Sequence, residues 1–163
     1  MQRPSSFSWR SPMPYIVIGI VGVLITLIIA YAVQLSGATT QVRLGSGDYQ
    51  LRVANTEQAR VTGLAGVEQL TKNGGLLMDF ESDGQWGIWM KGMKIPIDIV
   101  WLNKDKQVVH IAENVSPETP EKTYRPLEAA RYVLEFAAGT VSRDNITQGA
   151  VATFGMPTQG GSQ

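Results

Sequence analysis

Cysteine is absent from this 163-residue chain, and histidine occurs once, at His110. The absence of cysteine excludes disulfide bonds, thiolate metal sites and cysteine nucleophiles. A zinc site needs more histidine or cysteine ligands than this chain offers, and no G-x-S-x-G segment is present to hold a nucleophilic serine. A phosphate-binding glycine loop is missing too. We therefore expect no metal site and no cofactor.

An excess of charge is also missing. The chain has 14 basic and 14 acidic residues, which gives a formal net charge of zero. Proteins that bind nucleic acid usually carry a basic excess, because they must neutralise backbone phosphates. The composition therefore predicts no nucleic-acid partner.

One long segment has no charged residue at all, from Tyr15 to Val33. A helix that spans a bilayer needs about 20 apolar residues, so residues 15–34 are predicted to form a transmembrane helix. Arg3 and Arg10 lie before it, in a polar tail of residues 1–14. The excess of positive charge on that side predicts a cytoplasmic N-terminus and an extracytoplasmic domain in the cell membrane.

A cleaved signal peptide is the alternative. Residues 30–32 and residues 36–38 both have the small-x-small form that signal peptidases require. The apolar run is longer than the usual signal-peptide core of about 7–15 residues, which favours the anchor. Both interpretations export the domain, and cleavage would make it secreted or periplasmic.

The rest of the chain divides into a linker at residues 35–48, a β domain at residues 49–154 and a disordered tail at residues 155–163. Thr56 is the predicted N-cap of a short helix. Short apolar segments separated by turns are typical of a sandwich or barrel. We therefore predict a mainly β fold, a compact β-sandwich or barrel-like domain with one or two short helices. Strands are expected at residues 49–55, 76–80, 86–90, 97–102, 107–111, 130–137 and 150–154, with a long loop at 112–126.

The segment from Gln85 to Leu102 is the most informative part of the chain. Gly92 and Pro96 predict a turn between two strands. The second strand, residues 97–102, is apolar at nearly every position, which is typical of a strand buried on both faces. Asp98 lies within it, and a buried carboxylate must be paired, hydrogen-bonded or neutralised.

The same segment, WMKGMKIPIDI at residues 89–99, resembles the signature of the domain of unknown function 192 family of bacteria and archaea. The resemblance extends in order from Leu51 to Phe154. This family has no settled activity, so the resemblance implies a compact β domain with one or two short helices and leaves the function open. The further matching segments are LRVANTEQARVTGLAG (51–66), NGGLLMDFESDG (73–84), VVHIAENVSP (108–117), YVLEFAAG (132–139) and ITQGAVATF (146–154).

Two carboxylates, Asp98 and Glu135, are each flanked by apolar neighbours. Two carboxylates with different pKa values can perform acid–base catalysis, so a small hydrolase or lyase is one hypothesis. Alternatively, the two carboxylates and Arg131 form a structural polar core. We favour the structural role and predict that the chain is not an enzyme.

The turn between the two central strands carries Trp89, Lys91, Met93 and Lys94. An exposed aromatic ring beside a cation suits a sugar or a protein partner. We therefore predict that these four residues bind a ligand. The expected function is a membrane-anchored, extracytoplasmic, non-catalytic binding module for an envelope protein or a glycan.

Overall fold

A computed structural model of the chain describes residues 21–22 and 37–157. The β domain lies in one compact unit, Ala38–Gln163. In the part of the chain that the structure describes, no helix is both long and apolar enough to cross a bilayer. Apart from residues 21 and 22, the predicted transmembrane segment lies outside the described residues. The predicted cytoplasmic tail lies outside them entirely.

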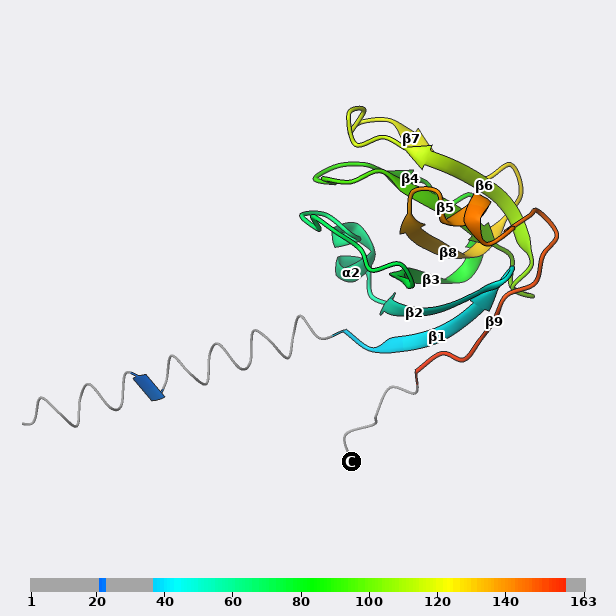
Figure 1. Ribbon diagram of the computed structural model, residues 1–163, viewed down its shortest axis with the longest axis horizontal. Helices are drawn as coiled ribbons and strands as arrows, with labels where there is room; N and C mark the ends of the chain where they lie inside the picture. Colours follow the sequence, from blue (N-terminus) through cyan, green and yellow to red (C-terminus); the bar gives the residue numbers. More distant parts are fainter. Residues whose placement is uncertain (1–20, 23–36, 158–163) are drawn as a thin grey trace, which may run out of the picture. The chain divides into compact units, whose positions relative to one another are not determined.

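The domain is built on one curled sheet with the strand order β6-β5-β8-β3-β2-β1-β9. Figure 1 shows this sheet bent into a half-barrel, with two short helices and a separate two-stranded ribbon, β4–β7. The mainly β prediction is therefore confirmed. The strands are β1 (Thr39–Leu44), β2 (Gly47–Ala54), β3 (Gly74–Gly84), β4 (Ile88–Trp89), β5 (Ile97–Leu102), β6 (Val108–Val115), β7 (Thr123–Tyr124), β8 (Ala130–Ala137) and β9 (Thr153–Phe154), and the helices are α2 (Glu57–Thr62) and α3 (Thr140–Arg143).

The C-terminal segment contacts both edges of the sheet. β9 pairs antiparallel with β1. Just before β9, the Val108 amide donates to the Ala150 carbonyl at 2.8 Å, and the Ala152 amide donates to the Lys106 carbonyl at 2.9 Å. These bonds hold the start of β6 close to the segment that leads into β9.

The central strands bury both of their faces, so the domain has two hydrophobic cores. Side chains alternate along β8, and Leu134 and Phe136 therefore face one core while Val133 faces the other. Strands at both ends of the sheet contribute to the first core, which places it on the concave face. The second core lies on the outer face, where the loop after α2 and the β4–β7 ribbon pack against β3, β5 and β8.

Asp98 is fully buried in β5 and faces the first core. Its Oδ1 accepts the Asn114 amide at 2.8 Å, and its Oδ2 accepts the Val141 amide at 2.9 Å. The first bond lies where β6 has one extra residue opposite β5, with Asn114 at a φ of 51°. The second lies in the first turn of α3, whose N–H groups have no partner within the helix. Asp98 is therefore hydrogen-bonded, as the sequence required, but its partners are backbone amides and, among the described residues, no cation pairs with it.

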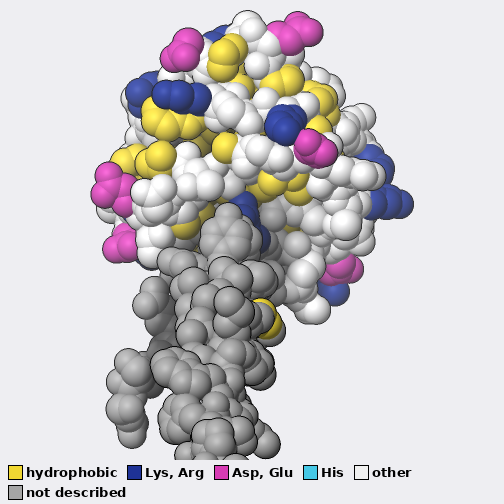
Figure 2. All heavy atoms as spheres, turned by 90° about the vertical axis from the view of Figure 1, so that its left-hand side faces the viewer, with side chains coloured by type: hydrophobic (Ala, Val, Ile, Leu, Met, Phe, Trp, Pro, Cys, Tyr) yellow, Lys and Arg dark blue, Asp and Glu magenta, His cyan; other side chains and the backbone are white. Residues whose placement is uncertain are grey.

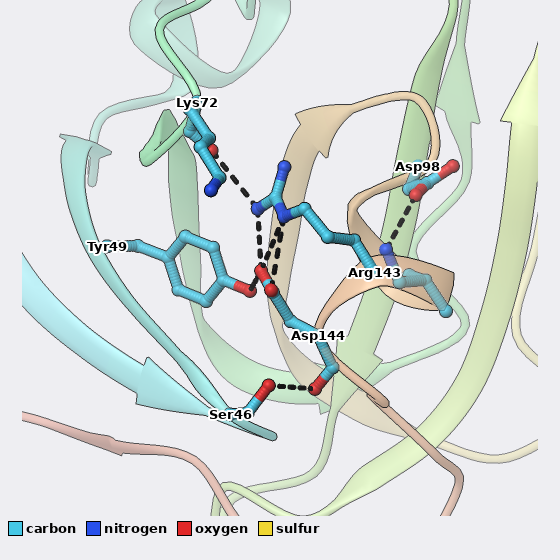
Figure 3. A network of polar contacts seen from close by, with 7 residues as sticks. Ser46, Tyr49, Lys72, Asp98, Arg143 and Asp144 are labelled. Carbon is cyan, nitrogen blue, oxygen red and sulfur yellow. Dashed lines mark hydrogen bonds and ion pairs between the residues drawn. The ribbon is translucent and has the colours of Figure 1, made fainter.

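The end of α3 is attached to β2 through Asp144 (Figure 3). The Tyr49 hydroxyl and the Arg143 guanidinium both donate to the Asp144 carboxylate. The hydrogen bond from Arg143 lowers the pKa of Asp144, whereas burial raises the pKa of Tyr49. Arg143 also donates to the Lys72 carbonyl at 3.2 Å. Together with Asp98, these contacts fix α3 against the first core.

The sheet extends beyond several of the predicted strands. β1 lies inside the segment predicted as a linker, where Val42 and Leu44 alternate with exposed polar residues. Two apolar residues are a weak signal, and pairing with β2 stabilises the strand. β6 continues to Val115, into the predicted loop, because it pairs with the buried β5. The strand predicted at residues 86–90 is shorter, since only Ile88 and Trp89 pair with β7.

Asp98→Ala is predicted to destabilise the domain strongly. The change leaves two amides without an acceptor, and each buried unsatisfied donor costs about 1–3 kcal/mol. We expect the melting temperature of the full chain in detergent, followed by circular dichroism, to fall by about 10 °C or more. Asp105→Ala is the control, because Asp105 lies in the exposed hairpin loop. Equal melting temperatures for the two variants would contradict the role given to Asp98.

Candidate functional site

A pocket of about 340 Å³ opens on the outer face of the sheet. It lies between α2, β3, β8 and the segment that contains β4. Figure 2 views the side of the domain on which α2 and β4 lie in Figure 1, and shows hydrophobic side chains interspersed with lysine and arginine. The pocket is lined by Glu57, Arg60, Val61, Thr62, Gly63, Leu64, Met78, Phe80, Trp86, Gly87, Ile88, Trp89, Lys91, Met93 and Glu135.

One wall of the pocket is α2, which lies in the connection between the parallel strands β2 and β3. The helix begins at the N-cap Thr56, whose hydroxyl accepts the Ala59 amide at 3.2 Å, as the sequence predicted. It ends at Gly63, which has a φ of 52°. None of its residues is buried, and Val61 is 51% exposed at the pocket. A short helix that packs its sides loosely against the sheet leaves room for the pocket.

Glu135 forms the inner end of the pocket. It lies in a cross-strand row with Arg52, Leu76 and Ile99, on the outer face of the sheet. The residue is 3% exposed, and its Oε2 has no hydrogen-bond partner among the described residues. Burial raises the pKa of Glu135 to about 7, although the charge of Arg52 opposes this shift. At neutral pH the carboxyl group can therefore be protonated or ionised.

An aromatic wall leads from Glu135 to the surface. The rings of Phe80 and Trp86 stack with centroids 4.5 Å apart and planes inclined by 10°. The Arg60 guanidinium lies 5.3 Å from the centre of the Phe80 ring and donates to the Asp79 carbonyl at 2.7 Å. The wall is therefore held in place by both stacking and hydrogen bonds.

The mouth of the pocket contains three of the four residues predicted to bind a ligand. Trp89 is 47% exposed, Lys91 is exposed and Met93 is half-buried, and all three line the pocket. Lys94 does not line it, and instead forms an exposed ion pair with Glu68 at 2.9 Å. The predicted loop and the pocket therefore coincide except at Lys94.

Asp98, Glu135 and Arg131 do not form one polar cluster. Asp98 lies opposite Phe136 in the sheet, and Glu135 lies opposite Ile99. Because paired residues point to the same face and neighbours alternate, the two carboxylates lie on opposite faces. Arg131 contacts neither of them and pairs with Asp79 at 3.1 Å. The interpretation as a single polar core is corrected here, and the structure does not bring the two carboxylates together.

The sequence did not indicate the contribution of α2 to the pocket. Glu57 and Arg60 belong to a short helix and Gly63 is its C-cap, and nothing in this sequence shows that the helix lines a pocket with Glu135, more than 70 residues later. One signal in the sequence could have identified Glu135 as a pocket residue, namely the alternation of side chains between the two faces of β8. Glu135 lies between Leu134 and Phe136, so its side chain must point to the other face.

The fold and the pocket define a mainly β domain with a ligand-sized cavity, and comparisons with known proteins place it in a family. The sequence profile of the domain of unknown function 192 family (DUF192), described as "Uncharacterized ACR", matches residues 40–154. The chain belongs to this family, as its motifs suggested. A comparison with curated proteins finds no match.

Two crystal structures share the fold. One is a candidate transcription regulator from Sinorhizobium meliloti 1021, with a TM-score of 0.70 and 30% identity, and the match covers 73% of this chain and 95% of that chain. The other is a protein of unknown function from Novosphingobium aromaticivorans DSM 12444, with a TM-score of 0.64 and 24% identity, covering 71% and 84%. The second likeness shows the fold alone.

Glu135→Gln is predicted to stabilise the domain at alkaline pH. The folded state of the native chain binds a proton at Glu135 more tightly than the unfolded state does, so its stability falls as pH rises from about 4.5 to 7. The full effect of such a shift is about 3 kcal/mol. Glutamine stays neutral, and we expect the variant to be more stable than the native chain at pH 8 and similar to it at pH 5.

The measurement is thermal unfolding of the full chain in detergent at both pH values. Glu121→Gln serves as the control, because Glu121 is exposed in a loop outside the pocket. The difference in melting temperature between Glu135→Gln and the native chain is the quantity compared. If this difference were the same at pH 5 and at pH 8, the Glu135 carboxyl would not titrate in this range.

Proposed function

We propose that this chain is a membrane-anchored, extracytoplasmic binding module whose pocket recognises a polar ligand of the cell envelope, such as the end of a glycan. One observation carries the proposal. A half-exposed tryptophan, Trp89, stands at the mouth of a cavity whose inner end is the buried Glu135, and the Oε2 of Glu135 has no hydrogen-bond partner among the described residues. The unpartnered carboxyl can receive a hydrogen bond from a ligand, and the tryptophan offers an apolar surface to it.

The shape of the pocket supports a small ligand or a chain end. Its volume lies within the range of about 300–1,000 Å³ that is typical of small-molecule sites. A largely apolar lining with a few converging polar groups is also typical of such sites. A flat protein surface would not reach Glu135, whereas a sugar ring or a single side chain can enter the cavity.

The backbone around the mouth is held in one conformation, which reduces the entropy lost on binding. Gly92, with a φ of 75°, accepts a hydrogen bond at its carbonyl from the Gly66 amide at 2.8 Å. The Met93 amide donates to the Met90 carbonyl at 3.1 Å, and Met90 is fully buried. The loop after α2 and the turn after β4 therefore support each other.

The proposal assigns no catalysis to the chain. A hydrolase or lyase that uses Asp98 and Glu135 together would need both at one ligand, and they lie on opposite faces of the sheet. The role named for the Sinorhizobium meliloti protein, transcription regulation, is not carried over either. The balanced charge of this chain offers no basic excess for DNA phosphates.

Trp89→Ala is predicted to abolish binding while leaving the melting temperature nearly unchanged, because the side chain is 47% exposed. Binding is measured by co-sedimentation of the full chain, in detergent, with purified cell-wall polysaccharide. Capture of solubilised envelope proteins is the second arm, and it tests the protein-partner alternative. Leu127→Ala is the matched control, since Leu127 is 82% exposed and lies outside the pocket lining. A large fall in melting temperature would instead make Trp89 part of the core.

Topology is tested separately. Protease added to intact spheroplasts is expected to digest the β domain and to spare the N-terminal segment in the membrane. Digestion only after lysis would reverse the proposed orientation. A mature protein that begins after residue 32 or residue 38 would show that the segment is a cleaved signal peptide.

A further inference from the structure

The inner end of the pocket is open because a glycine faces it. A Cβ atom placed on Gly63 would lie 3.9 Å from the Glu135 Oε2 and 3.5 Å from the Met78 Cε. Any side chain at this position would extend over the carboxyl group. Since Gly63 has none, Glu135 lines the cavity, although the residue is only 3% exposed and its Oε2 is buried.

The cations near Glu135 are engaged elsewhere. Arg52, in the same cross-strand row, donates to the Gly63 carbonyl at 2.6 Å. Arg60 of α2 donates to the Asp79 carbonyl and lies over Phe80. Lys91 is exposed at the mouth, and the exposed Glu57 provides an opposite charge on the facing wall. No described side chain donates a hydrogen bond to the Glu135 Oε2.

The walls between the mouth and Glu135 are aromatic and apolar. The faces of Phe80 and Trp86 carry the negative part of the ring quadrupole, which attracts a cation. The same wall contacts apolar C–H groups favourably. A ligand that suits this cavity therefore combines an apolar face with a group that donates strong hydrogen bonds at its end.

We propose that the pocket binds a primary ammonium group carried on a small body with an apolar face, as in an amino sugar, and that the ammonium donates to Glu135. This proposal rests on the proposed function of the pocket and specifies its ligand. An ammonium group has three donors, and hydrogen bonds between charged groups are roughly twice as strong as neutral ones. It supplies the missing hydrogen bonds, and it adds to the positive charge that Arg52 already places near the buried carboxylate.

Binding of this ligand is linked to a proton. The pKa of Glu135, raised by burial to about 7, means that much of the free protein carries a protonated carboxyl at pH 6. An ammonium ion binds the ionised form, so binding releases the proton. Affinity is expected to fall about tenfold for each unit of pH below the pKa of Glu135. The other charged residues near Glu135 are Glu57, Arg60 and Lys91, which line the cavity, and Arg52, which lies in the same cross-strand row.

The test uses the full chain in detergent and tryptophan fluorescence as the signal, since Trp86 and Trp89 line the pocket. The probes are the β-1,4-linked glucosamine trisaccharide and its fully N-acetylated counterpart, which has the same size without the ammonium groups. Phenethylamine and phenylethanol form a second matched pair. This pair tests whether the pocket recognises an amine on an aromatic compound as well as an amine on a sugar. Each probe is titrated at pH 5, 6 and 7.

We expect each amine to bind at least tenfold more tightly than its neutral counterpart at pH 7, and to lose affinity toward pH 5. Glu135→Gln should remove this preference, whereas the exposed control Glu121→Gln should keep it. Equal binding of amine and neutral probes, unchanged amine binding by Glu135→Gln, or no amine binding at all would each overturn the proposal. Co-sedimentation with cell-wall polysaccharide, and its loss in Trp89→Ala, tests the pocket independently of the ammonium group.

Discussion

The structure depends on one buried carboxylate, Asp98, which joins β5, β6 and α3. Its two oxygens accept amides from the irregular part of β6 and from the first turn of α3. Both donors lie where regular backbone pairing is interrupted, so they need an acceptor that only a side chain can provide. The irregular part of β6 and the position of α3 over the first core therefore depend on a charged residue in an otherwise apolar strand.

The sheet also separates two environments that use carboxylates differently. On the concave face, Asp98 is satisfied by the fold itself. On the outer face, Glu135 is also buried, and its Oε2 has no partner among the described residues. A buried polar group that lacks a partner lowers stability, and such groups are often retained for function. This contrast supports our assignment of a structural role to Asp98 and of ligand binding to Glu135.

The sequence predicted the elements whose signal is local. The bounds of the strand at residues 97–102 and of the strand at residues 130–137 agree with the structure, because continuous apolar runs between turn residues are unambiguous. The burial of Asp98 was predicted on the same basis. β1 was missed because pairing, and not its own composition, stabilises it. Of the pocket residues, only those at the mouth were predicted to bind a ligand, since the placement of α2 and Glu135 at one cavity depends on the path of the chain.

Strand β8 contributes side chains to both hydrophobic cores, and this determines which substitutions affect the pocket. Its odd and even positions belong to different cores, so a substitution at Glu135 alters the pocket, whereas one at Leu134 or Phe136 alters the concave interior. Most of the remaining pocket walls come from α2 and from the segment that contains β4, which contribute nothing to the first core. β3 adds Met78 and Phe80 from its outer face. Ligand preference can therefore diversify among relatives while the interior that holds the sheet together stays the same.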